Sequence, residues 1–318
     1  MRKDLLISLI IIFTLTMPLV AQNEQEKDGV HFIPLMKYDF LSLDSQNICS
    51  PSIGLVVMSD NVLFVGLYTR HSFDEPLLFD YPGVYHSIDV LLDGRKNRHQ
   101  YLGIFKSESD QPVYGGLKTF QTAVAYGYEL VQRQNYSLVL GGGLAVSDFG
   151  IELSNGEPWP LIPVPLIRMK YNSKCIETKF EFLTSPNLDL TIGPKSQFRF
   201  IGECRMDQFR DIRDLIFECS LAYRFFPVEH PMGDFAGISV GVKNDNYGAF
   251  NLGSYDTVDF EEEESIEVHY NAVFGMIDFT LLKITGGYAF SGRELYRGVD
   301  TRDIGEGYFL SIEGMYQF

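Results

Sequence analysis

The last eleven residues, Tyr308 to Phe318, read Y-F-L-S-I-E-G-M-Y-Q-F. Counted in steps of two from the C-terminal end, one set of positions is apolar or aromatic apart from a glycine, and the intervening set is mostly polar. Because successive side chains on a β-strand point to opposite faces, this stretch predicts a strand with one apolar face and one polar face. The two faces are therefore expected to meet different surroundings.

The same alternation recurs through the chain. It is cleanest from Phe120 to Leu130, from Tyr136 to Val146 and from Ile176 to Phe182. We expect fourteen strong strands, or twelve if short segments near the N-terminus fail to span, and a weak first segment from Val30 to Phe40. Leu188 to Arg205 is taken as one segment. The alternation loses phase between residues 185 and 227, which indicates that at least one segment in that region is misassigned.

The beginning of the chain has the layout of a secretory signal peptide. Arg2 and Lys3 precede an apolar run that starts at Leu5, and Ala21 precedes a polar stretch. We therefore expect a signal peptide at residues 1–21 and a single mature domain at residues 22–318. A retained membrane anchor is the alternative, but the run is shorter than the roughly 20 apolar residues that a spanning helix needs.

Composition excludes one class of partner and narrows the architecture. Against 26 basic residues the chain has 42 acidic ones, for a formal net charge of −16. Nucleic-acid binding is not expected, because phosphates require basic surfaces. The 29 Gly, 18 Tyr and 25 Phe residues suit many strands, tight turns and aromatic girdles. Any entry into a membrane must use a closed β-barrel, because no other stretch is long and apolar enough for a spanning helix.

The aromatic C-terminal strand resembles the signal that the barrel-assembly machinery reads in Gram-negative outer-membrane proteins. With the signal peptide and the alternating strands, the whole chain resembles small outer-membrane β-barrel proteins of these bacteria. The resemblance implies an all-β, transmembrane, antiparallel up-and-down barrel, exported through the periplasm and surrounded by outer-membrane lipids. The residues of the assembly signal are Tyr308, Leu310, Ile312, Tyr316 and Phe318.

A soluble β-sandwich or water-soluble barrel is the competing all-β fold. Such a fold would bury the apolar face inside. Roughly fourteen strands of Phe and Tyr would overfill that interior. The distribution of large side chains therefore favours a barrel with its apolar face outward.

Charged residues on the opposite face of five successive strand segments are the candidates for lining the lumen. They are Arg168, Lys170, Glu177, Lys179, Glu181, Arg199, Glu203, Arg205, Glu218 and Arg224. One interpretation is a water-filled lumen in which opposed charges set a transverse field for solutes. The other is a plug of salt bridges that fills the barrel. The sequence leaves both open, because it fixes the facing of a residue and not the width of the pore.

No catalytic site or cofactor is expected. The histidines offer no His-x-Ser spacing, which would place a general base and a nucleophile on one strand face. His71 and His86 are each followed directly by a serine, which points to the other face of a regular strand. The acidic loop from Asp256 to Glu264 lacks the spacing and turn glycine of a Ca²⁺ loop, so a solvated loop is expected there.

Two functions remain open on the sequence alone. The first is a diffusion channel for small solutes, which requires an open polar lumen. The second is a surface-exposed barrel with a filled lumen that acts through long loops, especially Gly248 to Glu264 and Ser291 to Gly305. The sequence identifies no extracellular partner for these loops.

Overall fold

The structure is a computed structural model that describes residues 29–78, 81–113, 117–147, 159–183, 185–206, 215–227, 236–251, 265–279, 281–296 and 300–315. The expected signal peptide, the acidic loop and residues Tyr316 and Phe318 of the assembly signal lie outside these residues. The division of the chain at residue 21 therefore stays a prediction.

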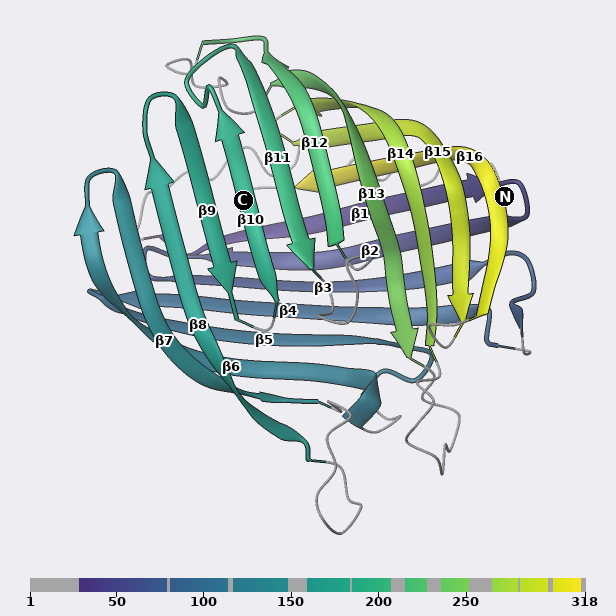
Figure 1. Ribbon diagram of the computed structural model, residues 1–318, viewed down its shortest axis with the longest axis horizontal. Coiled ribbons are helices and arrows are strands. Elements are labelled where there is room, and N and C mark those ends of the chain that lie inside the picture. Colours follow the sequence, from purple (N-terminus) through teal and green to yellow (C-terminus); the bar gives the residue numbers. More distant parts are fainter. Residues whose placement is uncertain are drawn as a thin grey trace.

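Within the described residues, sixteen strands form a closed antiparallel barrel in which each strand pairs with its neighbours in the chain (Figure 1). The strands are β1 (His31–Leu43), β2 (Gln46–Met58), β3 (Val62–Phe73), β4 (Val84–Lys96), β5 (His99–Ser109), β6 (Phe120–Arg133), β7 (Tyr136–Val146), β8 (Leu161–Asn172), β9 (Ile176–Phe182), β10 (Pro186–Ile192), β11 (Phe198–Met206), β12 (Leu215–Arg224), β13 (Gly237–Asn251), β14 (Ser265–Phe279), β15 (Leu282–Tyr296) and β16 (Asp300–Met315). A 3₁₀ turn, η3 (Leu117–Thr119), precedes β6.

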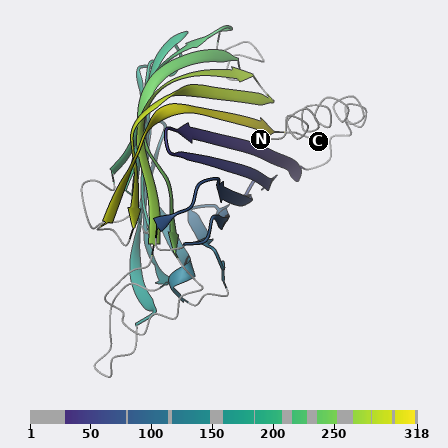
Figure 2. The ribbon, with the colours of Figure 1, turned by 90° about the vertical axis from the view of Figure 1, so that its right-hand side faces the viewer.

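The C-terminal strand closes the barrel against the first strand. β16 pairs antiparallel with β1 from Leu35 opposite Met315 to Leu43 opposite Gly307. Figure 2 shows this junction, where the last strand, in yellow, lies beside the first, in purple. Closure leaves no unpaired sheet edge, which is the condition for a sheet to cross a membrane. The predicted all-β, up-and-down barrel is confirmed.

The predicted strand number of fourteen, or twelve, is wrong, and both extra strands have an identifiable origin. The weak first segment is a full strand, β1. The segment from Leu188 to Arg205 is two strands, β10 and β11, joined by a turn in which Gly193 has φ +72°. This turn lies inside the region where the alternation loses phase. The turn between these two short strands has few residues, so the alternation of apolar and polar residues is interrupted only briefly. In the sequence the two strands therefore look like one.

The connections differ in length between the two ends of the barrel. The turns at 59–61, 97–98, 134–135, 173–175, 193–197 and 280–281 lie at one end, called here the short-turn end, and only 225–236 is long there. The connections at 74–83, 110–119, 147–160, 207–214 and 252–264 lie at the other, the long-connection end, together with three short ones at 44–45, 183–185 and 297–299. In outer-membrane barrels the short turns face the periplasm and the long loops face outward.

The two long loops proposed from the sequence are shorter than expected. β13 runs to Asn251, so only 252–264 connects it to β14, and 291–305 is strand except for 297–299. The pairing of β15 with β16 is irregular around Gly292, and Ser291 has φ +57° while Gly305 has φ +79°. These bulges shift the alternation by a residue, so the sequence reads as a loop although the strands continue.

The inner face of the barrel is identified by Arg168 of β8. Its guanidinium lies 2.8 Å from a carboxylate oxygen of Asp93 on β4 and donates a hydrogen bond to Gln100 on β5. β6 and β7 lie between these strands in the sheet, so the contact crosses the lumen. The register of the ladders then fixes which residues of every other strand point inward.

The outer face carries a continuous set of exposed apolar side chains. The most exposed are Phe198, Tyr308, Leu221, Val240 and Val124, at 62–75% of their full surface. Such a surface is stable only against hydrocarbon, since a water-soluble protein rarely exposes a large contiguous apolar patch. The structure thus confirms, at the level of the fold, the resemblance to outer-membrane β-barrel proteins, with an outer surface that suits contact with lipid.

Glycines on the inner face of β7 permit its close approach to β6. A Cβ added to Gly143 would clash with the carbonyl oxygen of Val124 and lie 2.7 Å from the Cα of Ala125. We therefore expect Gly143→Ala to lower the free energy of unfolding by about 1–3 kcal/mol, because the backbones must separate. Urea titration of the protein refolded in lipid vesicles measures the change. Gly142→Ala is the control, since its nearest atom lies 3.5 Å away, and an equal loss there would contradict the explanation.

Candidate functional site

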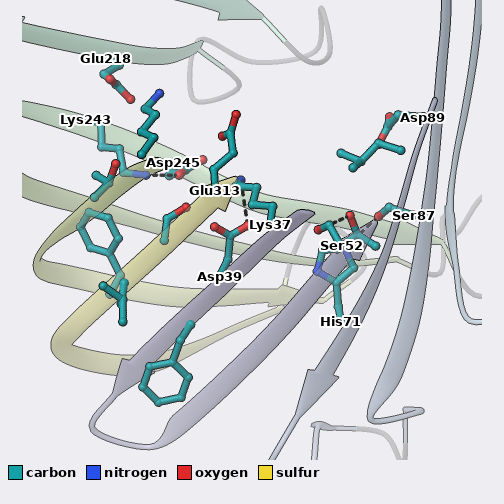
Figure 3. Close-up of a pocket in the computed structure, with 18 of the residues that line it drawn as sticks. Lys37, Asp39, Ser52, His71, Ser87, Asp89, Glu218, Lys243, Asp245 and Glu313 are labelled. Atoms are coloured by element: carbon teal, nitrogen blue, oxygen red, sulfur yellow. Dashed lines mark hydrogen bonds and ion pairs between the residues drawn. The ribbon is translucent and has the colours of Figure 1, made fainter. Parts of the chain in front are cut away.

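A chamber of about 520 Å³ lies inside the barrel, lined by β1 to β5 on one side and β11 to β16 on the other (Figure 3). Its lining is rich in ionisable side chains of both signs. The basic ones are Lys37, Lys106, Arg205, Lys243 and Lys283, and the acidic ones are Asp39, Asp89, Glu108, Glu218, Asp245 and Glu313. A chamber lined in this way favours polar solutes and water over apolar ligands.

Most of the lysines that line the chamber bond to an acid two residues further along the same strand. The three pairs are Lys37 with Asp39 at 2.8 Å, Lys106 with Glu108 at 3.2 Å and Lys243 with Asp245 at 2.6 Å. Residues two apart share a strand face, so the Lys-x-Asp or Lys-x-Glu spacing delivers both charges to the lumen together. The charges of the chamber are therefore balanced locally, which reduces the cost of removing them from bulk water.

Lys243 is held by three neighbours. Besides its ion pair with Asp245, its ammonium lies 4.7 Å from the ring centroid of Phe309 and 5.6 Å from that of Tyr270. The Tyr270 hydroxyl donates a hydrogen bond to the same Asp245 carboxylate at 3.0 Å. A cation over two aromatic faces and beside a carboxylate has little freedom to move. Lys243 is thus a fixed positive charge on the chamber wall.

One part of the opposite wall, on β2 to β4, carries neutral polar side chains that form hydrogen bonds between strands. Nδ1 of His71 lies 2.8 Å from the Ser50 hydroxyl, and its Nε2 lies 2.9 Å from the Ser87 hydroxyl, which links β2, β3 and β4. The hydroxyls of Ser52 and Thr69 are 2.8 Å apart beside them. Figure 3 shows Ser52, His71 and Ser87 across the chamber from Lys243 and Asp245. The histidine bonds serines of neighbouring strands, a contact that spacing within one strand does not predict.

An apolar cluster lies between the chamber and the long-connection end. Its members come from β1 to β4, β14 to β16 and the connection 74–83. They include Leu41, Leu43, Ile48, Phe73, Leu77, Tyr81, Tyr85, Ile266, Val268, Tyr296, Ile304 and Phe309. Leu77 and Tyr81 show that the connection 74–83 folds into the barrel and contributes to this cluster. Tyr270 and Phe309 belong both to the cluster and to the lining of the chamber, so the cluster borders the chamber on that side.

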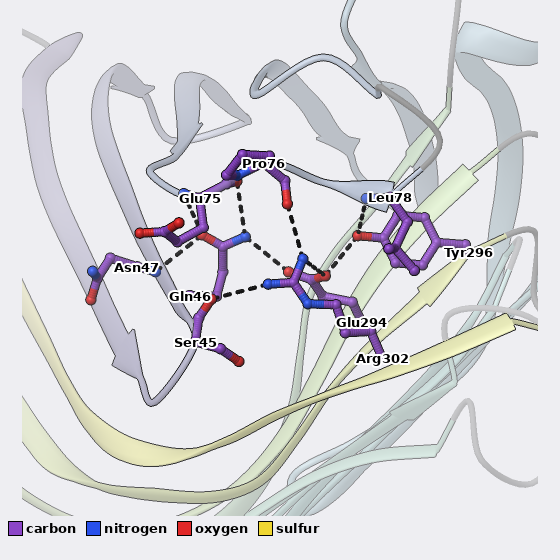
Figure 4. Close-up of polar contacts among 9 residues, drawn as sticks. All are labelled: Ser45, Gln46, Asn47, Glu75, Pro76, Leu78, Glu294, Tyr296 and Arg302. Carbon is purple, nitrogen blue, oxygen red and sulfur yellow. Dashed lines mark hydrogen bonds and ion pairs between the residues drawn. The ribbon is translucent and has the colours of Figure 1, made fainter.

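A buried carboxylate, Glu294 of β15, fastens this connection (Figure 4). Its side chain is fully buried and accepts hydrogen bonds from the Gln46 amide at 3.0 Å and from the Tyr296 hydroxyl at 2.6 Å. The Tyr296 hydroxyl in turn accepts a bond from the backbone N–H of Leu78. Glu294 is therefore linked to the connection 74–83 by two side chains, Gln46 and Tyr296, each of which bonds both the carboxylate and the backbone of the connection.

Arg302 and Gln46 complete this network. The Arg302 guanidinium lies 3.6 Å from Glu294 and donates hydrogen bonds to the carbonyl oxygens of Pro76 and Ser45. The Gln46 carbonyl oxygen accepts the backbone N–H of Glu75 at 3.1 Å. Backbone groups of residues 75, 76 and 78 are thus held by side chains of β2, β15 and β16. A loop satisfied in this way is positioned by the barrel wall.

The ten candidates for lining the lumen all lie on the inner-facing register of their strands. Of these, Arg205 and Glu218 line the chamber. A second group surrounds Arg168, which lies 2.7 Å from Glu181, and Glu181 lies 3.9 Å from Lys179. Five others share the face but do not line the chamber: Lys170, Glu177, Arg199, Glu203 and Arg224. The structure therefore brings the candidates together in part only.

Most of the charged residues of the chamber were missed by sequence reasoning. Lys37, Asp39, Lys243 and Asp245 lie on the first strand and in the last third of the chain, outside the five segments considered. A signal was available, because a lysine two residues before an acid recurs in β1, β5, β9 and β13. What the sequence lacked was a way to tell which strands face each other across the lumen.

The lumen is narrowed away from the chamber as well. Inner-facing apolar residues of β5 to β8, together with Leu183 just after β9, form a second cluster: Leu102, Ala123, Ala125, Ala145, Val164, Leu166 and Leu183. At the long-connection end, Asn251 of β13 pairs with Ser109 of β5, so opposite walls of the barrel meet there. The barrel is thus pinched at that end, and the chamber lies on one side of the pinch.

Two kinds of site are absent from the part of the chain that the structure describes. No group of three His, Cys, Asp or Glu side chains there is arranged to hold a metal ion. No helix among those residues has the length and apolar character needed to cross a membrane.

No known protein family and no curated protein matches the chain. Its fold is similar to a bacterial polysaccharide outer membrane secretin, at 8% identity and a TM-score of 0.43, over 92% of this chain and 100% of that one. The outer membrane protein OprD from Pseudomonas aeruginosa has 8% identity and a TM-score of 0.39, over 94% and 96%. An outer membrane channel from Pseudomonas putida F1 has 12% identity and a TM-score of 0.32, over 94% and 98%.

Proposed function

We propose that the protein is an outer-membrane channel for small polar solutes, with the charged chamber as the site that a solute occupies on its way through. The observation that carries the proposal is a chamber of about 520 Å³, lined by side chains of both signs, inside a closed barrel. Its volume lies within the range of small-molecule sites. An interior filled only for stability would not need so many ionisable groups around an open space.

A plugged barrel that acts at the cell surface is the second candidate. It is favoured by the apolar cluster and by the network of Glu294 and Arg302, which hold the connection 74–83 over the chamber. In the channel hypothesis the same connection acts as a gate that opens. The two functions therefore differ in whether this connection moves.

Conductance in a planar bilayer separates the two functions. The refolded protein is first checked for the heat-dependent gel shift of a closed barrel. A channel gives discrete conductance steps, whereas a permanently plugged barrel stays silent although it is folded. Silence of the folded protein across a range of voltages would reject the channel and direct attention to the surface connections.

Neutralising Lys243 tests whether the chamber lies on the conducting path. Lys243→Gln leaves the Asp245 carboxylate without its partner, so the local potential becomes more negative. A unit charge acts on an ion 4 Å away with about 1 kcal/mol even in water, so the ratio of cation to anion permeability should rise by about fivefold. Reversal potentials in a salt gradient measure this ratio. Lys195→Gln, in the exposed turn between β10 and β11, is the control, and an equal change there would remove the chamber from the path.

The outward side chains of β16 support a role in assembly. Tyr308 is 69% exposed on the outer face, and Leu310 and Ile312 share that face by register. We propose that the barrel-assembly machinery recognises this strand before it closes against β1. A surface partner of the long connections remains part of the second hypothesis.

A further inference from the structure

Four basic side chains gather at the short-turn end of one sector of the barrel. Lys96 ends β4, Arg98 lies in the turn between β4 and β5, Arg133 ends β6 and Lys174 lies in the turn between β8 and β9. All four are exposed. Their strands are neighbours in the sheet from β4 to β9, so the four residues form one rim, called here the basic rim. A concentration of positive charge is unexpected in a chain of net charge −16.

The acids of this sector lie on the other face of the sheet. The described residues 92–103, 126–140 and 167–178 contain three acids, Asp93, Glu129 and Glu177. By register all three point into the lumen, where Asp93 pairs with Arg168 and Glu129 pairs with Arg95. The outer surface of the sector therefore carries only positive charge. No acid on that surface neutralises the electrostatic potential of the basic rim.

Aromatic side chains border the basic rim on the outer face. Arg133 lies opposite Tyr136, and Tyr136 lies opposite Tyr171 on the next strand. Lys96 lies opposite His99, whose ring packs against Tyr128 at a centroid distance of 5.4 Å. His99 is also hydrogen-bonded to the Tyr126 hydroxyl at 2.6 Å. Tyrosine concentrates where a membrane protein meets the headgroup region, because the ring is apolar and its hydroxyl is polar.

We propose that the basic rim, with its bordering tyrosines, is a binding surface for the headgroups of anionic phospholipids. The tyrosines set the depth of the lipid interface, and the guanidinium and ammonium groups lie just beyond them, where phosphate oxygens are found. Arginine pairs with phosphate through two parallel hydrogen bonds, and lysine adds a compact charge. The surface is independent of whether the lumen conducts.

An acidic soluble protein is the alternative occupant of a basic surface. The tyrosines favour lipid, because they lie on the same outward face as the exposed Leu130, Leu140 and Met169, which contact hydrocarbon in the membrane. A surface built for a soluble partner would project beyond the apolar belt. Here each basic residue lies two to four residues along the chain from an exposed apolar or aromatic residue: Lys96 from Leu92, Arg98 from Tyr101, Arg133 from Leu130 and Lys174 from Ile176.

The test measures which lipids surround the barrel. The protein is refolded in vesicles of phosphatidylcholine containing a small fraction of spin-labelled phosphatidylglycerol or, separately, spin-labelled phosphatidylcholine. Electron spin resonance gives the relative association of the two lipids with the protein. We expect a preference for phosphatidylglycerol of about threefold or more at low salt, since each basic group near the surface contributes to the attraction. The preference should fall at 0.5 M salt, where screening is short-ranged.

Variants assign this preference to the basic rim. The fourfold variant K96Q/R98Q/R133Q/K174Q should lose most of it, and the pairs K96Q/R98Q and R133Q/K174Q should each lose part of it, which covers a failure of the fourfold variant to fold. Lys170→Gln is the matched control, because Lys170 lies at the same end beside Tyr171 but points into the lumen. It should leave the preference unchanged.

Two results would overturn the proposal. The first is that the wild-type protein associates equally with phosphatidylglycerol and phosphatidylcholine at low salt. This result would also hold if an acidic protein, and not lipid, were the partner of the rim. The second is an equal loss of preference in Lys170→Gln and in the paired rim variants, which would make the effect one of net charge rather than of this surface.

Discussion

Replacing Glu294 with alanine should release the connection 74–83 and increase both the conductance of the barrel and the cleavage of this connection by added protease. The substitution leaves the buried Gln46 amide and Tyr296 hydroxyl without their acceptor, and it leaves Arg302, which is 25% exposed, without its carboxylate. Removing one partner from a buried charged network costs about 3–5 kcal/mol, because the other partners remain desolvated. The loss of free energy destabilises the state in which the connection 74–83 is held closed. The fraction of molecules with this connection released should therefore increase.

Single-channel recording and limited proteolysis of the refolded protein measure this effect together. Glu306→Ala is the matched control, since Glu306 lies at the same end on β16 with an exposed side chain. It changes the net charge equally and should leave conductance and cleavage as in the wild type. If Glu294→Ala lowers the stability of the barrel but changes neither gating nor cleavage, the connection is a permanent plug.

Replacing Arg168 with alanine should destabilise the barrel as a whole. The guanidinium lies 2.8 Å from Asp93 and 2.7 Å from Glu181, and its side chain is 9% exposed. The contact with Glu181 is ionic, while Nη1 donates a hydrogen bond to Gln100. Loss of the arginine leaves two carboxylates facing each other across the lumen, and we expect the free energy of unfolding to fall by about 3–5 kcal/mol.

Urea titration in vesicles, read by the heat-dependent gel shift, measures the loss in Arg168→Ala. Lys179→Ala is the control, because its ion pair with Glu181 is long, at 3.9 Å, and its side chain is 42% exposed. Exposed pairs of this kind contribute about 0–1 kcal/mol. The double variant R168A/E181Q should recover part of the loss, since it removes one of the two uncompensated charges. Equal losses in Lys179→Ala and Arg168→Ala would contradict the role assigned to Arg168.

The barrel fold could be predicted from the alternation of apolar and polar residues in the sequence. β7 and β9 have the predicted bounds, and β16 carries the predicted apolar face at Tyr308, Leu310 and Ile312. These strands are regular, with one face in contact with lipid and the other in the lumen. Where one face of a strand contacts lipid and the other contacts water, apolar and polar residues alternate along the chain. Such a strand can be predicted from the sequence alone.

The alternation misled where the backbone departs from a regular strand. The dipeptide Asp93-Gly94 has the composition of a tight turn, but β4 continues to Lys96 and the chain turns at Asn97, which has φ +57°. The Asp93 side chain points into the lumen and pairs with Arg168, which lies four strands away in the sheet, a contact that the local sequence does not indicate. The bulges around Gly292 made the ends of β15 and β16 look like a loop in the sequence. Each inserted residue moves the following side chains to the opposite face of the strand, so the alternation is interrupted.

Side-chain alternation was enough to predict a membrane barrel with charged residues inside, because the polarity of each strand indicates which of its faces meets lipid. The folded structure was needed to show that the barrel closes, which charges share a chamber, that Glu294 and Arg302 hold a connection beside it, and that β5 meets β13. Those facts depend on distances across the lumen between strands far apart in the chain. Periodicity along one strand contains no information about such distances, because it is set by the local backbone and not by the curvature of the sheet.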